Sequence, residues 1–175
     1  KEVGIKSASD RWEQLFSQST YDYKARIHSG IVPILELDEI PDPCDEDQMY
    51  RAWSSRAENT TSRELGVHWL SSPTPVGGYA FAVKIKGDTM ANPSGTPTIP
   101  EGCYVIFDPE NEQQPHNGSI IMLRGLPSDP PIIKQLVVDG PNKYLIALNP
   151  NYRPIEYSED VYTVLGVAVN QITFL

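Results

Sequence analysis

The strongest constraint on the fold of this chain is a series of short apolar segments that runs from Tyr79 to the C-terminus. The segments that favour β-strands lie at 79–86, 103–108, 118–124, 131–138, 143–148 and 161–169. Turn residues rich in glycine, proline and asparagine separate them, as at 140–142 and 149–151. Short strands at this spacing predict a mostly β protein with a partly closed antiparallel fold.

The last apolar segment, from Val161 to Leu175, is longer than the others. If it lies at the border of the sheet, its unpaired backbone groups would invite pairing with another chain.

The composition agrees with a turn-rich β protein, because the 175 residues include 16 prolines and 12 glycines. This length fits one domain that can bury a substantial core. The net charge of −9 argues against direct binding of nucleic acid by this chain, since phosphate contacts need clustered lysine and arginine. No apolar run approaches the roughly 20 residues of a membrane span, and no signal peptide is visible.

The cysteines and histidines suggest neither a metal nor a cofactor. Cys44 and Cys103 lack metal or redox spacing, and we expect free thiols in a reducing cytosol. His28, His68 and His116 are scattered, without the spacing of a metal site or of a histidine-based triad.

Residues 1–30 are expected to form an arm outside the β domain, which would comprise residues 31–175. A short helix with one apolar face can begin in the arm, capped by Ser9 or Asp10. The patterning does not supply the three helices of a complete helix-turn-helix domain. Because the sequence starts at Lys1 rather than at methionine, we expect it to be part of a longer protein.

The β domain opens with an apolar strand at 31–37, followed by an acidic run at 38–47. The aspartates of this run could bind a cation, or they could form a solvated loop that leads into a helix at 46–57. A calcium loop needs a glycine turn and a closing glutamate in fixed register, and both are missing here. We therefore favour the solvated loop.

A candidate nucleophile follows the first strong strand. Phe81, Val83 and Ile85 alternate with polar or small residues, and the strand ends at the turn Gly87-Asp88-Thr89-Met90. A hydroxyl held at a strand end beside a glycine turn is how several folds present a nucleophile. Thr89 carries such a hydroxyl.

A candidate general base lies in the apolar strand at 131–138, where Lys134 is the only charged residue. Burial disfavours the ammonium form, so a lysine held there would have a lowered pKa. A neutral lysine can take a proton from a hydroxyl, as in Ser-Lys peptidases. By itself the pairing of Thr89 with Lys134 is a weak signal, because most strand lysines face solvent.

A set of sequence motifs links these candidates in a fixed order. The motifs are Val83-Lys-Ile-Lys-Gly-Asp-Thr-Met90, Ile99-Pro-Glu-Gly102, Val105-Ile-Phe-Asp-Pro109, Asn117-Gly-Ser-Ile-Ile121, Ile133-Lys-Gln-Leu136, Leu148-Asn-Pro-Asn-Tyr152 and Gly166-Val-Ala-Val169. Together they resemble the C-terminal domain of the LexA and phage-repressor family, whose members are Ser-Lys self-cleaving peptidases. The resemblance covers about 67–175 and extends more loosely back to Ile31.

The resemblance implies a role for each candidate. The nucleophile would be Thr89, the general base Lys134, and the amides of Asp88 and Thr89 would form the oxyanion hole. It also implies a cytoplasmic transcriptional repressor that forms a homodimer through its C-terminal region. Operator DNA would be bound by a helix-turn-helix domain that precedes Lys1.

Two departures from the family pattern affect self-cleavage. The nucleophile position holds threonine instead of serine, which adds a methyl group and restricts χ1. The family also cuts itself at Ala-Gly or Cys-Gly shortly after the strand that matches residues 32–35, and neither dipeptide occurs there in this chain. A gapless alignment places Ile40-Pro41 at the cut, where the proline ring would crowd a peptidase cleft.

These departures predict a repressor domain that cleaves itself slowly or not at all. Such a repressor would need another release route, for example an antirepressor protein; a RecA-type co-protease is the partner expected if cleavage persists. Three alternatives stay open: an active Thr-Lys autoprotease that cuts within 36–46, a mutagenesis-factor-type accessory protein without a helix-turn-helix, and an unrelated β-barrel module. A signal-peptidase-like enzyme would need a membrane anchor, which the sequence lacks.

Overall fold

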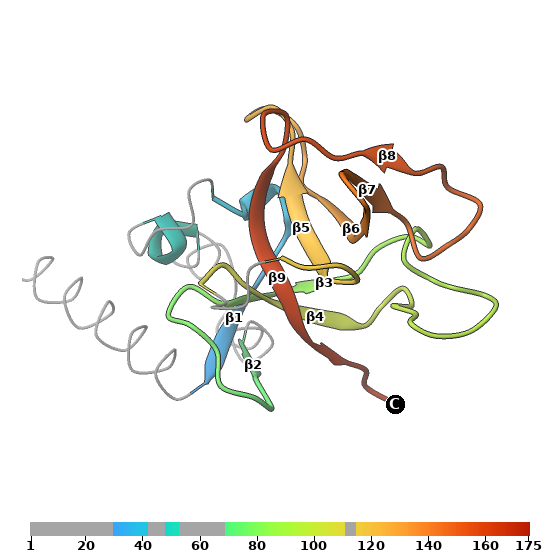
Figure 1. The fold of residues 1–175 in the computed structure, drawn as a ribbon. Coiled ribbons are helices and arrows are strands. Elements are labelled where there is room, and N and C mark those ends of the chain that lie inside the picture. The colour runs from blue at the N-terminus through green and yellow to red at the C-terminus, as the bar shows by residue number, and fades with distance from the viewer. Residues whose placement is uncertain (1–29, 42–47, 53–68, 111–114) are drawn as a thin grey trace, which may run out of the picture.

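A computed structural model describes residues 30–41, 48–52, 69–110 and 115–175 of the chain (Figure 1). The expected helix near Ser9 and Asp10, the acidic positions 42–47 with Cys44, and His28 and His68 lie outside these residues.

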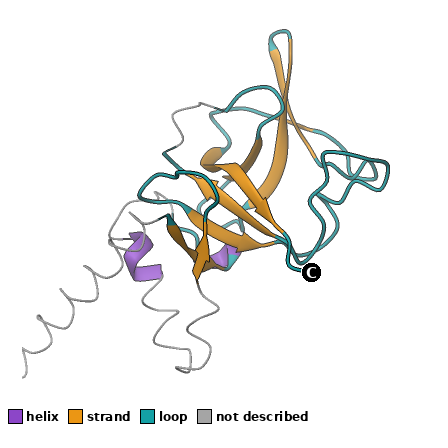
Figure 2. Cartoon of the chain, turned by 90° about the horizontal axis from the view of Figure 1, so that it is seen from below, coloured by secondary structure: helices purple, strands orange, loops and turns teal. Residues whose placement is uncertain are grey.

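Nine strands form one sheet in the described part of the chain. They are β1 Ile31–Leu35, β2 Trp69–Ser71, β3 Phe81–Lys84, β4 Tyr104–Asp108, β5 Ile120–Arg124, β6 Ile132–Asp139, β7 Asn142–Ile146, β8 Ile155–Glu156 and β9 Thr163–Ile172. Their order in the sheet is β2-β1-β3-β4-β9-β5-β6-β7-β8. Strands and loops make up nearly all of the described chain in Figure 2, which confirms the predicted mostly β fold.

The sheet differs in two details from the predicted antiparallel, partly closed arrangement. It is open, and β1 pairs with β3 in parallel, with Ile34 opposite Ala82 and Leu35 opposite Val83. Parallel neighbours require a long connection between them, and the segment from Leu35 to Phe81 is long enough to supply one.

The main hydrophobic core packs against one face of β3 and β4. Phe81, Val83 and Ile85 belong to it, whereas Ala82, which points the opposite way, lies in a second cluster with Val32. The predicted alternation along β3 is therefore present, with apolar residues covering both faces of the strand. Residues 48–52 are helical.

The long C-terminal strand β9 lies inside the sheet and not at its border. Residues 163–167 pair with β5, and residues 167–172 pair with β4. A Cβ at Gly166 would lie 3.2 Å from the Cβ of Phe107, so a residue without a side chain lets β9 approach β4 closely. Beyond Val167, β9 pairs with β4 alone among the described strands.

Candidate functional site

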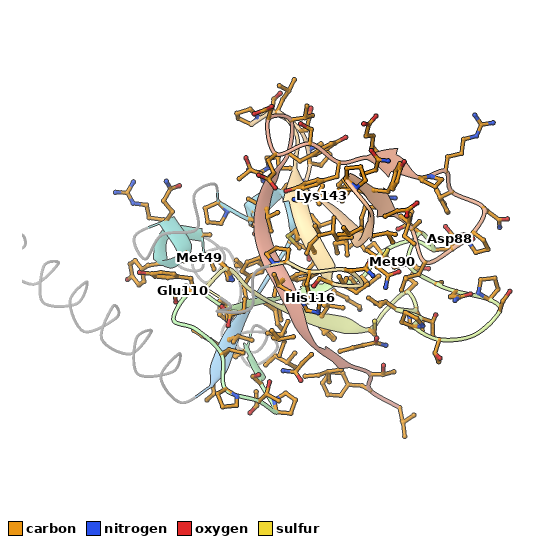
Figure 3. All side chains as sticks on the ribbon, in the orientation of Figure 1. Met49, Asp88, Met90, Glu110, His116 and Lys143 are labelled. Atoms are coloured by element: carbon orange, nitrogen blue, oxygen red, sulfur yellow. The ribbon has the colours of Figure 1, made fainter. Side chains whose placement is uncertain are left out.

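The turn that carries Thr89 is fixed at both ends. Gly87 has a φ of +78°, which favours glycine, and its amide donates to Oε1 of Glu101 at 2.9 Å. The amide of Ala91 donates to the Asp88 carbonyl at 3.0 Å and closes the turn. Met90 is buried in the main core, so Thr89 lies half-buried between an exposed aspartate and a core residue. Figure 3 shows the side chains of Asp88 and Met90 on this turn.

Lys134 lies on β6 opposite Ile121 of β5, and only 8% of its surface is exposed. Burial lowers the pKa of its amine, because a low-dielectric environment disfavours the ammonium form. The amine forms neither a hydrogen bond nor an ion pair with another described residue. The amine lies over the ring of Tyr152, whose centroid is 5.8 Å from Nζ.

Thr89 and Lys134 line the same pocket, which has a volume of about 170 Å³. Its walls come from the end of β3, the Thr89 turn and the start of β6, and from Leu37 of the short 3-10 helix Leu37–Glu39. Most of these side chains are apolar, so a lysine that opens into the pocket is surrounded by few groups able to solvate its charge.

The two amides assigned to an oxyanion hole have no acceptor within the described chain. The backbone N–H groups of Asp88 and Thr89 donate a hydrogen bond to none of the described residues. The backbone carbonyl oxygens of the same two residues each accept at least one. Free amides beside a hydroxyl can stabilise a developing negative charge.

The predicted cleavage position lies elsewhere. Ile40 is 2% exposed and belongs to the main core, and its carbonyl accepts a hydrogen bond of 2.9 Å from Arg124. Neither Ile40 nor Pro41 lines the pocket, although Leu37, just upstream, does. An exposed ion pair of 2.7 Å joins Glu36, at the start of the same segment, to Lys86, which lines the pocket.

Three residues that contact Ile40 or the Asp88 turn were not among the site residues predicted from the sequence. Arg124 holds the Ile40 carbonyl, while Asn149 and Tyr152 bind the Asp88 turn. Asn149 and Tyr152 belong to the motif Leu148-Asn-Pro-Asn-Tyr152, whose polar side chains in a turn are the sequence signal for such a role. Arg124 ends an apolar strand, and its partner lies 84 positions away, so local sequence gave no signal for it.

No group of three or more histidine, cysteine, aspartate or glutamate residues in the described segments could hold a metal ion. Among the same residues, no helix has the length and apolar character that crossing a membrane requires.

Comparison with known sequences places this fold in a family. The profile of the Peptidase S24-like family matches residues 50–169, more than half of the chain. The chain belongs to the Peptidase S24-like family. The LexA-type resemblance predicted from the ordered motifs is thereby confirmed.

Several relatives in this family are regulators of mobile elements. The chain is 44% identical over 115 residues to the HTH-type transcriptional regulator for conjugative element SXT of Vibrio cholerae and to that for element R391 of Providencia rettgeri, covering 66% of this chain and 52% of each relative. It is 32% identical over 118 residues to Repressor protein C2 of Salmonella phage P22, covering 67% of this chain and 52% of the relative. The chain thus spans about half the length of these relatives.

Proposed function

We propose that this chain is the C-terminal dimerisation and regulatory domain of a phage-type transcriptional repressor, with a peptidase site that acts slowly or not at all on its own chain. The observation that carries the proposal is the shared pocket of Thr89 and the buried Lys134, in a chain whose relatives are named as repressors and transcriptional regulators.

Operator DNA would be bound by a part of the protein that precedes these residues. The relatives are named HTH-type regulators, and the present chain covers about half of their length. The net charge of −9 fits this division, because a domain with few clustered lysines and arginines is a poor ligand for phosphate.

A homodimer through the C-terminal region is supported by the end of β9. Past Val167 one edge of this strand is unpaired within the described residues, and Phe174 and Leu175 just beyond it are exposed. Phe174 packs edge-on against Tyr104 at 5.8 Å between ring centroids, which extends an apolar surface along β4. An open strand edge beside exposed apolar residues favours association with a second copy.

Cleavage of a peptide bond in this pocket would use the side chains of Thr89 and Lys134. The neutral amine of Lys134 would take the proton of the Thr89 hydroxyl while Oγ1 bonds to the peptide carbonyl carbon, and the amides of Asp88 and Thr89 would receive the oxyanion. The C–N bond then breaks, the amine leaves with the proton from Lys134, and water hydrolyses the resulting ester.

Three features would slow this reaction on the chain itself. The Thr89 methyl group restricts χ1, and a small misplacement of a nucleophile can reduce a rate by orders of magnitude. The carbonyl of Ile40, which Thr89 would attack, is bonded to Arg124 in the core. Pro41 adds a ring at the leaving nitrogen and removes the N–H that a substrate strand could donate.

Incubation of the full-length repressor at high pH, where Lys134 is neutral, tests this proposal. Mass spectrometry should find the chain intact, in wild type and in Thr89→Ser. A discrete fragment cut between residues 36 and 46 that disappears in Lys134→Ala would contradict it and establish the active autoprotease instead.

A triple variant tests whether the pocket is competent. Thr89→Ser combined with Ile40→Ala and Pro41→Gly restores the serine and an Ala-Gly bond, and it should cut itself faster than Thr89→Ser alone. Lys134→Ala added to the triple variant is the control that must abolish cutting. An intact triple variant would mean that the pocket has lost its chemistry altogether.

Release from DNA would depend on a partner if self-cleavage is absent. An antirepressor protein that binds this domain fits an uncut chain, whereas a RecA-type co-protease fits one that still cuts. Adding each to the full-length repressor on operator DNA separates them, because the first releases an intact repressor and the second a cleaved one.

A further inference from the structure

The loop from Asn149 to Tyr152 binds the Thr89 turn at four points. The side-chain amide of Asn149 donates to the Asp88 carbonyl at 3.1 Å and to Oδ2 of Asp88 at 3.2 Å. The backbone amide of Asn149 donates to the Thr89 carbonyl at 3.1 Å. The hydroxyl of Tyr152 donates to Oδ1 of Asp88 at 2.6 Å, the shortest of these contacts.

The contact to the Asp88 carbonyl also sets the direction of an amide. The peptide bond between Asp88 and Thr89 is trans, so the Thr89 N–H points away from the Asp88 carbonyl in the same rigid plane. Fixing this carbonyl with Asn149 therefore fixes the direction of the Thr89 N–H, one of the two amides without an acceptor in the described chain. Asn149 is 4% exposed, so water does not compete strongly for its amide group.

Tyr152 contacts both the turn that carries Thr89 and the strand that carries Lys134. Its hydroxyl holds the Asp88 carboxylate, and its ring lies under the Lys134 amine, 5.8 Å from Nζ to the ring centroid. A ring face at this distance attracts an ammonium group and limits where the side chain can lie. One tyrosine thus spans from the turn that carries the hydroxyl to the strand that carries the amine.

We propose that Asn149 and Tyr152 are positioning residues for the pocket of Thr89 and Lys134. Asn149 fixes the direction of the Thr89 amide, and Tyr152 fixes the position of the turn that carries Thr89 relative to Lys134. This inference rests on the proposed function of the pocket. It assigns no chemistry to either residue, since both act through Asp88, Thr89 and Lys134.

The pKa shifts of Tyr152 and Lys134 suit this positioning role. The hydrogen bond to Asp88 raises the pKa of Tyr152, whereas burial lowers the pKa of Lys134. Lys84 and Lys86 also line the pocket, but both are exposed. Both directions favour a pH range in which Lys134 is neutral while Tyr152 keeps its proton and still holds the turn.

A reactive phosphonofluoridate tests the proposal on the full-length Thr89→Ser protein. The serine oxygen bonds to phosphorus, fluoride leaves, and Lys134 takes the proton, so the modification rate measured by mass spectrometry reports the pocket. The rate should rise with pH as Lys134 deprotonates and fall again as Tyr152 ionises. Tyr152→Phe should lower the maximum by at least about tenfold and remove the fall at high pH.

Matched controls separate positioning from general stability. Tyr157→Phe removes another tyrosine with a raised pKa, one that stacks on Tyr162, and Asn151→Asp changes an exposed neighbour in the loop. Both should leave the rate and its pH profile unchanged, whereas Asn149→Asp should lower the rate. An unchanged rate and an unchanged high-pH fall in Tyr152→Phe would overturn the proposal.

If the phosphonofluoridate modifies none of the variants, the result counts against the proposed function of the pocket but does not test the positioning role. A second measurement then tests that role. In wild-type protein the amide resonances of residues 87–90 should shift with the midpoint of Tyr152 ionisation. This transition should persist in Tyr157→Phe and vanish in Tyr152→Phe. Amide chemical shifts of residues 87–90 that do not change as Tyr152 ionises would refute the positioning role.

Discussion

At the scale of single residues, one pocket brings together a buried amine and the hydroxyl of Thr89. Lys134 is buried without a counter-ion among the described residues, an arrangement that costs folding free energy while the amine is charged. Groups with perturbed pKa values cluster at functional sites, because stability alone would favour an apolar residue there.

The buried amine leads to a prediction about stability. Lys134→Met should raise the free energy of unfolding at pH 7, since methionine fills similar space without a charge to desolvate. The folded-state pKa of Lys134 is lowered, so between that pKa and the unfolded value of about 10.4 the unfolded state binds more protons. Wild type should therefore gain stability across this range, and the advantage of the variant should shrink.

Urea denaturation at a series of pH values measures this difference. Lys143→Met is the control, because that amine is exposed and paired with Glu159 at 2.7 Å. An advantage of Lys134→Met that stays constant up to pH 11 would show that the amine does not titrate with a lowered pKa.

At the scale of elements, the segment that follows β1 passes the pocket but does not present its predicted cleavage position to it. Leu37 lines the pocket, and three residues later the Ile40 carbonyl is bonded to Arg124 at the end of β5. The Nε of Arg124 is buried without a hydrogen-bond partner among the described residues, which is costly. The bond from the same guanidinium group holds the Ile40 carbonyl in the core.

Removing this contact should loosen the segment. Arg124→Met keeps most of the side-chain volume but leaves the buried Ile40 carbonyl without its donor, at a cost of about 1–3 kcal/mol. Hydrogen exchange at residues 37–40 should speed up by roughly tenfold or more, as expected for a loss of about 1.4 kcal/mol or more.

Arg153→Met removes an exposed arginine and should leave this exchange as in wild type. If Arg124→Met exchanges no faster than Arg153→Met, the segment is held by the burial of Ile40 and not by Arg124.

At the scale of the whole molecule, the surface proposed for dimerisation begins next to the strand that leads to the pocket. Phe174 contacts Tyr104, which pairs with Lys84 at the end of β3, and Lys84 lines the pocket. Neither Phe174 nor Tyr104 lines the pocket itself, so Phe174 can be substituted without removing a pocket residue.

Phe174→Glu should weaken the dimer by at least about tenfold, because it places a charge in an apolar surface that two copies would bury. Sedimentation velocity over a range of protein concentrations measures the change. Leu126→Glu is the matched control, since Leu126 is also exposed but lies in the β5–β6 turn, away from the C-terminus (Figure 1). Equal effects of both variants, or an effect of neither, would argue against a dimer through the C-terminal region.

Sequence alone determined most of the strands and the family. Alternation and turn residues predict strands from local preferences, and the order of the motifs along the chain is typical of the family. The short β8 was missed because two residues give no periodic signal, and the parallel pairing of β1 with β3 was missed because strand direction depends on the path of the chain.

Only the tertiary structure decided which of these residues meet. It placed Thr89 and Lys134 on one pocket, buried Ile40 against Arg124, and brought Tyr152 against both Asp88 and Lys134. Each contact joins residues that are distant in sequence and depends on the order and register of β3, β5 and β6. Local composition carries no record of that register, because it is set by how the whole sheet buries its apolar faces.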